Sequence, residues 1–207
     1  MKSTLTDAGI GVGLILRVPG IARPGTVCDA LASHIDLFPT ICELAALDPP
    51  LWLQGSSLAP LLDGSAPAVR DAIFGEVTFH AAYEPQRVIR TQRWTYIRRF
   101  EERDRPVLPN IDASPALDYW LENGFAERTL SSISLFDNAL DPLQRENLAG
   151  VASLAEVENQ LADRLAVWMR ATEDPLLEGP VDLPPGATVN RASDLSPDGP
   201  LVERDYR

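Results

Sequence analysis

A continuous apolar run, GVGLILRV at residues 11–18, constrains the fold of this chain more than any other segment. Its apolar residues do not alternate with polar ones, and Pro19 and Gly20 end it. A strand with one face in water alternates, whereas an unbroken run is typical of a strand buried on both faces, as in parallel sheets under helices. Such a strand needs a neighbouring strand on each side. The run therefore predicts that this part of the chain belongs to the end of a larger mixed α/β sheet.

The next segment, SHIDLFPTICELAAL, has apolar residues at helical spacing and predicts a helix over residues 36–47. Ser33 or Asp36 can serve as the N-cap, because their side-chain oxygens accept hydrogen bonds from the free amides of a first turn. His34 is expected to be a structural residue at the helix entrance. The segment LQGSSLAPLLDG, residues 53–64, predicts a loop that leads into a single helical turn.

Short segments with period-two alternation follow and predict an antiparallel sheet. The four candidate strands are residues 71–79, 87–91, 94–100 and 132–137. A tight turn at Gln92 and Arg93 makes a hairpin of the second and third. Four arginines cluster on this hairpin, and with the acidic residues after it they are expected to form a solvated, salt-bridged face: Arg90, Arg93, Arg98 and Arg99. The charged and proline-rich residues 101–131 predict an inserted excursion with one short helix, at 114–123.

The last regular element is predicted to be a long helix. Ser153, with Glu156 three residues later, fits a capping box, and apolar residues then recur at helical spacing as far as Trp168. The helix is expected to end near Thr172 and to pack across the sheet. Residues 173–207 are crowded with Pro, Gly and Asp and show no periodicity, which predicts an extended or poorly ordered tail.

Composition excludes several classes of function. The chain is strongly acidic, with a formal net charge of -12 and an isoelectric point near 4.5. Its negative charge repels nucleic acid and anionic membranes, so neither is expected as a partner. The opening MKSTLTDAG lacks the apolar core of a signal peptide, no stretch is apolar enough to span a membrane, and the compartment stays unknown. Cys28 and Cys42 stand in apolar surroundings without metal-ligand spacing, and both are expected in the core.

Several phrases, in this order, resemble the C-terminal part of sulfatases, which belong to the alkaline phosphatase-like superfamily. They are KSTLTDAGIGVGLILRVPG, SHIDLFPTICELAAL, LQGSSLAPLLDG and SLFDNALDPLQRENLA. Within that family, FGEVTFHAAYEPQRVIRTQRWTYIRRF and WMRATEDP are most similar to bacterial relatives of heparan N-sulfatase, also called sulfamidase. The resemblance extends over nearly the whole chain, to about residue 178.

The resemblance implies a division of the chain and a fold class. Residues 1–65 are expected to be the C-terminal piece of the large α/β sulfatase domain. Residues 66–172 are expected to form a small α+β subdomain, an antiparallel sheet with one long helix, and residues 173–207 the tail.

The resemblance also implies sulfuric ester or sulfamate hydrolysis, with a formylglycine nucleophile and a calcium ion. In the family both depend on an N-terminal portion that carries a C/S-x-P/A-x-R motif and calcium-binding aspartates. Cys28 is followed by DALA and Cys42 by ELAA, so neither fits the motif, and no cofactor is expected in this chain itself. The chain alone is therefore predicted to be inactive, as a truncated gene product or as one half of a split enzyme with a complementary N-terminal half as partner. The complete enzyme would act on a sulfated small molecule or glycan.

Five residues are the candidates for a site. Lys2 stands where the resemblance places an active-site lysine that contacts the sulfate group. Glu76, His80, Tyr83 and Arg87 lie in EVTFHAAYEPQR, at the end of a strand, where polar side chains could bind the alcohol portion of a substrate. The competing interpretation makes His80 a half-buried structural histidine and Arg87 a surface charge.

Two other functions remain open at this stage. One is a non-catalytic module derived from a sulfatase, which binds a sulfated glycan or a partner chain through residues 76–87. The other is a phosphoesterase or phosphonate hydrolase of the same superfamily, because fold similarity alone does not fix the reaction.

Overall fold

The computed structural model describes residues 4–206, which divide into two compact units. The sheet unit comprises the N-terminal residues up to 11, residues 74–89 and the chain from residue 94 onward. The helical unit comprises residues 12–73 and 90–93. Lys2 lies outside the described residues.

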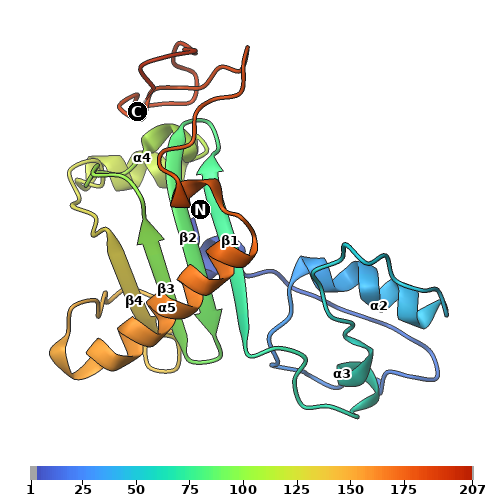
Figure 1. Cartoon of the computed structure of the whole chain (residues 1–207). Coiled ribbons are helices and arrows are strands. Elements are labelled where there is room, and N and C mark those ends of the chain that lie inside the picture. The colour runs from blue at the N-terminus through green and yellow to red at the C-terminus, as the bar shows by residue number, and fades with distance from the viewer. Residues whose placement is uncertain (1–3, 207) are drawn as a thin grey trace. The chain divides into compact units, whose positions relative to one another are not determined.

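The sheet unit is built on a four-stranded meander in the order β1-β2-β3-β4 (Figure 1). The strands are β1 (Ala72–Phe79), β2 (Tyr83–Thr91), β3 (Trp94–Arg99) and β4 (Ile133–Asp137). β3 and β4 pair antiparallel, with Tyr96 opposite Leu135. The predicted antiparallel sheet is therefore confirmed, with the hairpin turn between Thr91 and Trp94 as expected.

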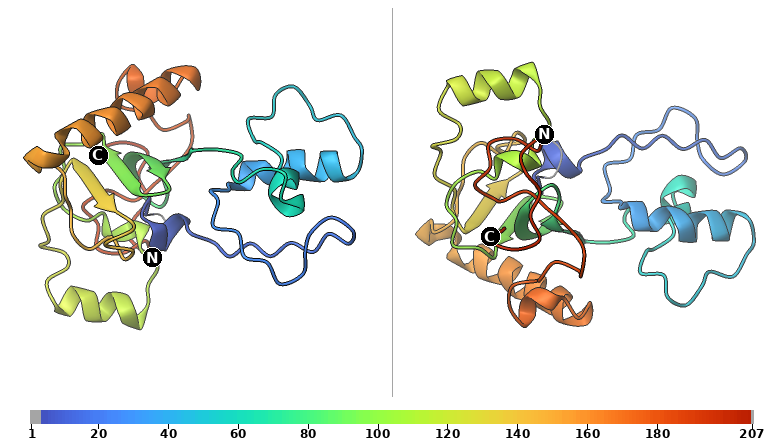
Figure 2. Two further views of the ribbon diagram at one scale, coloured as in Figure 1. Left: turned by 90° about the horizontal axis from the view of Figure 1, so that it is seen from below. Right: turned by 90° about the horizontal axis from the view of Figure 1, so that it is seen from above.

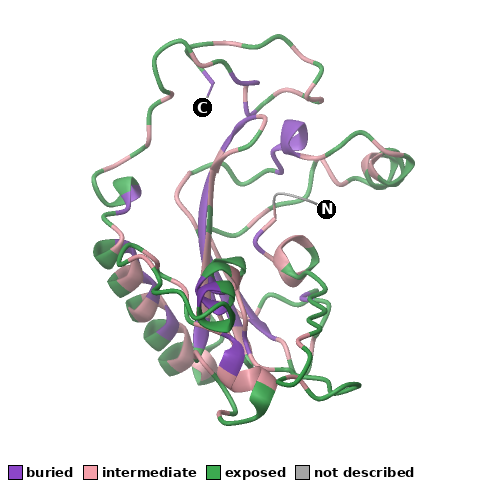
Figure 3. Ribbon diagram, turned by 90° about the vertical axis from the view of Figure 1, so that its right-hand side faces the viewer, coloured by how far each residue is buried: buried purple, intermediate pink, exposed green. Residues whose placement is uncertain are grey.

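The helix α5 (Ala155–Ala171) packs across one face of the sheet (Figure 2). Leu161, Leu165 and Met169 recur every four residues and are buried against it, while Trp168 stacks on Phe74 with ring centroids 5.1 Å apart. Figure 3 shows burial concentrated along the sheet, with buried and exposed residues alternating along α5. The predicted long helix with its stripe toward the sheet is confirmed.

The predicted capping box at the start of α5 is wrong. A 3-10 turn, η3 (Ala152–Leu154), contains Ser153, so the first α-helical residue is Ala155 and no side chain caps it. The carboxylate of Glu158 instead accepts a hydrogen bond of 2.8 Å from the Gly150 backbone amide. The C-terminal end lies at Thr172, as predicted.

The other face of the sheet is covered by the N-terminal segment with α1 (Asp7–Ile10) (Figure 2). Leu5 inserts into a core cluster with Val88, Ile97 and Phe136. The excursion predicted after β3 contains a 3-10 turn, η2 (Leu108–Asn110), and the short helix α4 (Pro115–Glu122).

The C-terminal segment has little regular structure, but it is packed rather than loose. It contains one 3-10 turn, η4 (Pro175–Leu177), and an isolated bridge that joins Val189 to Val202 by hydrogen bonds of 3.0 and 2.7 Å. Tyr206 is buried, and its ring lies 5.9 Å from that of Tyr83. The segment lacks regular structure, as its missing periodicity predicted, and apolar side chains spaced among the prolines still reach the sheet unit's core.

The helical unit contains η1 (His34–Asp36), α2 (Leu37–Leu44) and α3 (Ala59–Asp63). The predicted helix and the predicted helical turn are confirmed, although α2 ends three residues early, where Ala46 takes a left-handed φ of 53°. His34 is exposed at the helix entrance.

Of the two predicted N-caps, Ser33 is confirmed, because it caps η1 in a capping box with Asp36, whereas the side chain of Asp36 makes no cap bond to α2. Its carboxylate is fully buried, accepts hydrogen bonds of 2.8 Å from the amides of Ser33 and Ser56, and pairs with Arg70. Thr40 adds a bond of 2.8 Å from the Leu58 amide to its hydroxyl. These contacts explain the aspartate and the threonine of SHIDLFPT, because both side chains bind backbone amides of the next phrase and so join helix to loop.

The predicted buried strand at residues 11–18 is not formed. The segment has no helix or strand, and Val12 and Ile15 are 62% and 96% exposed. Nothing among the described residues pairs with it, so a strand has no ladder to join. Cys28 is exposed for the same reason, because the chain around it is unpacked, whereas Cys42 on α2 is buried as predicted.

Candidate functional site

A hollow of about 230 Å³ lies on the sheet unit where the N-terminal segment meets β1. Its walls come from two stretches that are distant in sequence. The lining residues are Thr4, Leu5, Gly9 and Ile10 from the first stretch, and Glu76, Val77, Phe79 and His80 from the second. Two of the predicted substrate-binding residues, Glu76 and His80, are therefore brought together there.

Two glycines allow the walls to approach. At Gly9 a side chain would place its Cβ 2.1 Å from the carbonyl oxygen of Thr4, so the turn into α1 closes only without one. At Gly75 a Cβ would lie 3.1 Å from Cγ1 of Val88 and 3.7 Å from Cδ2 of Leu5. The segment before α1 can therefore lie flat on the sheet and form one wall of the hollow.

Two polar residues, Glu76 and His80, border the hollow, and the carboxylate of Glu76 is directed to Arg87, on the face of β1 opposite to Gly75 and Val77. The side chain of Glu76 is 61% exposed, and its Oε2 lies 3.5 Å from Nε of Arg87. His80 is exposed, and its backbone amide donates a bond of 3.1 Å to the carbonyl of Ala82. A carboxylate accepts and an imidazole can donate or accept hydrogen bonds.

Arg87 is inside the protein, on β2, with only 1% of its surface exposed. Its Nε and Nη2 donate bonds of 2.5 and 2.9 Å to the two carboxylate oxygens of Asp174. Its Nη1 donates to the carbonyls of Val77 and Gln86 at 2.9 Å and to the Thr78 hydroxyl at 3.2 Å. The guanidinium thus ties three segments together beneath Glu76, and the competing interpretation of a surface charge does not describe it.

The partner of Arg87 has a perturbed acidity. Burial by itself raises the pKa of the Asp174 carboxyl, but hydrogen bonds from Arg87 and from the Leu176 amide, with the charge of Arg87, outweigh it and hold the pKa below the ordinary value. The carboxylate therefore stays ionised, and it also caps η4 through the Leu176 amide at 3.0 Å. The phrase WMRATEDP contains Asp174, but no local pattern in it marks this aspartate as the partner of an arginine.

Tyr83 is also interior. It is 1% exposed, and its hydroxyl accepts a bond of 3.2 Å from the Val181 amide. Its ring packs against Phe79, one of the lining residues, at 4.9 Å. Of the four residues predicted to bind the alcohol portion, Glu76 and His80 thus face solvent, while Tyr83 and Arg87 lie behind the hollow. A contact of any of them with substrate stays a prediction.

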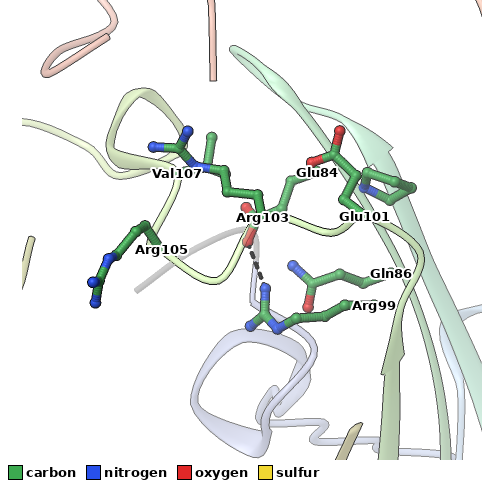
Figure 4. Close-up of a pocket in the computed structure, with 8 residues that line it drawn as sticks. Glu84, Gln86, Arg99, Glu101, Arg103, Arg105 and Val107 are labelled. Carbon is green, nitrogen blue, oxygen red and sulfur yellow. Dashed lines mark hydrogen bonds and ion pairs between the residues drawn. The ribbon is translucent and has the colours of Figure 1, made fainter. Parts of the chain in front are cut away.

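A second concave spot, around β2 and β3, is too small for a sugar. Its volume is about 10 Å³, which corresponds to a single water molecule. Figure 4 shows Arg99 paired with Glu84, at 2.9 Å, with Gln86 beside Arg99 and Arg105 directed away. The pairing of Arg99 agrees with a salt-bridged face rather than an anion site.

No metal site is evident in the part of the chain that the structure describes. Among residues 4–206 no three His, Cys, Asp or Glu side chains gather in a group that could hold a metal ion. Within the same residues no helix combines the length and the apolar content needed to cross a bilayer.

The fold defines a class: an α+β unit in which one long helix packs across a four-stranded sheet. The family model for the C-terminal part of N-sulphoglucosamine sulphohydrolase matches residues 2–123, so the chain belongs to that family. An ulvan-active sulfatase of Formosa agariphila is 30% identical over 188 residues, which cover 88% of this chain and 38% of that protein. Human N-sulphoglucosamine sulphohydrolase is 25% identical over 182 residues, covering 76% of this chain and 36% of the relative.

Solved sulfatases share the fold at lower identity. A 2-O GAG sulfatase has a TM-score of 0.58 at 23% identity, over 81% of this chain and 31% of its own. A second structure, solved in complex with its substrate D-glucosamine-2-N,6-O-disulfate, has a TM-score of 0.57 at 21% identity, over 76% of this chain and 28% of its own. The chain therefore spans less than two fifths of the length of these relatives.

Proposed function

We propose that this chain is the C-terminal portion of a sulfatase and that its hollow receives the alcohol or amine side of a sulfated sugar. Family membership supports the reaction class. The observation that supports a substrate-binding role for this portion is that Glu76 and His80 line one hollow. A sugar offers hydroxyls to both side chains and a ring face to Phe79.

Hydrolysis of a sulfate ester or sulfamate needs a nucleophile at sulfur, positive charge near the sulfate oxygens, and a proton for the leaving group. From this chain we assign the positive charge to Lys2, by resemblance. Glu76 and His80 would orient the sugar. Arg87 and Tyr83 would act through them, as positioning residues, because they hold β1, β2 and the C-terminal segment in place.

The nucleophile and the calcium ion implied by the family would come from a complementary N-terminal portion. Neither Cys28 nor Cys42 has the sequence context of the formylglycine motif, and the described residues hold no group that fits calcium. The complementary portion is thus part of the proposal, and a sulfated glycan is the proposed substrate class.

Two assays test the proposal. The purified chain, with calcium and an aryl sulfate, is expected to give no turnover. Turnover by the chain alone that disappears in a Lys2→Ala variant would refute this division of labour. In an enzyme completed by an N-terminal portion, His80→Ala is expected to raise KM for a sulfated sugar by about tenfold or more, with little change for a small aryl sulfate.

A matched control separates recognition from folding. His34→Ala removes the other histidine of the chain, which is exposed on η1 and is not among the residues that line the hollow. It should leave both KM values unchanged. Equal losses on both substrates in His80→Ala would contradict a role in sugar recognition.

A further inference from the structure

The turn between β1 and β2 carries His80, but its own sequence does not fix its shape. It consists of His80, Ala81 and Ala82, and so it has none of the glycine, proline, asparagine or aspartate residues that favour a particular turn. Within it, the amide of His80 donates a hydrogen bond of 3.1 Å to the carbonyl of Ala82. Ala82 is nevertheless fully buried. The conformation of the turn, and with it the place of His80, therefore depends on the segments that pack against it.

Two segments that are distant in sequence hold the turn. The side-chain oxygen of Asn110, on η2, accepts a bond of 2.8 Å from the amide of Ala82. The amide of Asn190 donates a bond of 2.9 Å to the carbonyl of Ala81, and Ala82 and Asn190 form an isolated parallel bridge. Both asparagines are buried, at 3% and 1% exposed, so water does not compete for these bonds. The backbone of the turn is thus held by buried partners on other segments.

Asn190 belongs to a loop that closes on itself through Tyr206. We call residues 179–206 the terminal loop, and it lies at the end of the sheet where β1 passes into β2 (Figure 1). The hydroxyl of Tyr206 accepts a bond of 3.1 Å from the amide of Leu183, and its carbonyl accepts one of 2.9 Å from the amide of Ala192. Tyr206 thus joins the beginning and the middle of the loop to its end.

The ring of Tyr206 also packs against the two residues that flank the turn. It lies 5.9 Å, between ring centroids, from both Phe79 and Tyr83. These side chains form an apolar cluster apart from the central core of the sheet. The cluster contains Phe79, Tyr83, Val181, Leu183, Val189, Val202 and Tyr206, and the core contains Leu5, Val88, Ile97 and Phe136. A change at Tyr206 is therefore expected to loosen the turn while the core stays packed.

We propose that the terminal loop determines which sugar the site accepts, by fixing the turn that carries His80, and that Tyr206 is its positioning residue. This inference rests on the proposed function, in which His80 orients the sugar. His80 lines the hollow with an exposed side chain, so the backbone beneath it sets where the imidazole lies. A recognition group has to be held within about 0.5 Å of its productive position, by residues that are themselves locked by packing. The terminal loop supplies that support.

The place of the terminal loop in the chain suits an element that differs between relatives. The match to the family model ends at residue 123, and the terminal loop lies beyond it. Loops vary more between relatives than the elements they connect, and they often carry or position binding residues. A change in this loop would therefore alter the sugar that is accepted and leave the hydrolysis itself intact.

Amide hydrogen exchange on the full chain tests whether Tyr206 fixes the turn. Tyr206→Ala should speed exchange at the amide of Ala82 by at least about tenfold, while the amides of Val88 and Ile89 on β2 stay protected and report that the sheet is folded. Tyr206→Phe keeps the ring and should retain most of the protection. Leu195→Ala is the matched control, because it shortens a side chain of the same loop that is 74% exposed, and it should change nothing.

Kinetics test whether the loop acts through His80. In an enzyme completed by an N-terminal portion, the probes are D-glucosamine-2-N,6-O-disulfate and nitrophenyl sulfate. Tyr206→Ala should raise KM for the sugar by about fivefold or more and leave KM for the aryl sulfate within about twofold. Adding Tyr206→Ala to His80→Ala should raise KM for the sugar no further, because both changes remove one interaction. A purely structural defect would instead lower kcat for both probes.

The outcomes separate this inference from the proposed function. If His80→Ala leaves KM for the sugar unchanged, the proposed function is refuted and the inference with it. If His80→Ala raises KM but Tyr206→Ala does not, or if the two effects multiply, only the inference is overturned. If Tyr206→Ala also exposes the β2 amides, the same measurements on Tyr206→Leu decide. A loss of β2 protection there too overturns the inference, because Tyr206 would then stabilise the whole sheet.

Discussion

Replacing Arg87 by methionine should destabilise the sheet unit strongly, because it strands a buried carboxylate. The side chains of Arg87 and Asp174 are each 1% exposed, so water cannot replace the guanidinium. Two charge-assisted bonds, of 2.5 and 2.9 Å, disappear, along with three bonds to neutral oxygens. Removing one partner of a buried pair typically costs about 3–5 kcal/mol. That is a large part of the 5–15 kcal/mol, roughly, by which domains are stable.

Urea and thermal unfolding, followed by far-ultraviolet circular dichroism, measure the loss. For a chain of this size about 3–5 kcal/mol corresponds to a fall in Tm of roughly 6–20 °C. Arg99→Met is the matched control, since Arg99 pairs with Glu84 at 2.9 Å but the two side chains are 23% and 15% exposed. Its expected cost is at most about 1 kcal/mol.

A double variant separates the lost pair from the stranded charge. Arg87→Met with Asp174→Asn removes the uncompensated charge and keeps an oxygen for the Leu176 amide, which now donates to Asp174 at 3.0 Å. The double variant should therefore be more stable than Arg87→Met alone. If Arg87→Met costs no more than Arg99→Met, or if Asp174→Asn worsens it, the description of Arg87 as the anchor beneath the hollow is wrong.

Three further predictions follow from single groups. The folded-state pKa of Asp174 lies below its ordinary value of 3.8. Its stabilising contribution is therefore present above that value and is lost as pH falls through the folded pKa. The free energy of unfolding should thus fall less steeply between pH ~5 and ~2 in Asp174→Asn than in the unaltered chain. Burial raises the pKa of Tyr96 above 10.0, and the charge of Arg98 opposes this shift. The stabilising contribution of Tyr96 is therefore present below that pH and is lost as pH rises through the folded pKa. In alkaline buffers the Tm of Tyr96→Phe should fall less with rising pH than the Tm of the unaltered chain. Gly55→Ala should lower the unfolding free energy of the helical unit by about 1–3 kcal/mol in urea titrations. The reason is that the new Cβ would lie 1.9 Å from the carbonyl oxygen of Ile35. An unchanged urea midpoint would contradict that close approach.

The elements that sequence predicted well are those whose stabilising contacts repeat locally. α5 carries a buried residue every four positions, at Leu161, Leu165 and Met169, so the spacing of apolar residues predicted its buried face and its C-terminal end. β3 and β4 alternate, and their register places Tyr96 beside Leu135 on one face. In both cases the residue pattern and the packing share one period.

Contacts between residues far apart in sequence could not be predicted from local spacing. The capping box of Ser33 and Asp36 is local and follows from their spacing, but the Asp36 carboxylate also binds the amide of Ser56 and the guanidinium of Arg70. Asp174 follows α5 in a proline-rich segment, so nothing local paired it with Arg87 on β2. A charged group reveals its partner only when the fold brings the two together, and composition near either residue carries no such information.

The candidate site shows the same division. His80 and Glu76 were singled out as polar groups at a strand end, and they do face solvent in one hollow. Arg87 lies four residues after Tyr83 on the same strand, and its side chain points inward and pairs with Asp174. Strand periodicity separates inward from outward positions only when the extent of the strand is known, and β2 begins earlier than its apolar pattern indicated, at Tyr83.

The run at residues 11–18 is the one place where pattern and structure disagree in a physically informative way. A segment apolar on both faces is stable as a strand only when ladders form on both edges, and each free amide or carbonyl buried without a partner would cost about 1–3 kcal/mol. In the described chain water solvates those groups, at the expense of leaving Val12 and Ile15 exposed. The apolar pattern of this segment therefore predicts a strand whose neighbours lie outside the residues that the structure describes. If amide hydrogen exchange shows residues 12–17 unprotected when the remaining part of a sulfatase is supplied, the apolar pattern has some other cause.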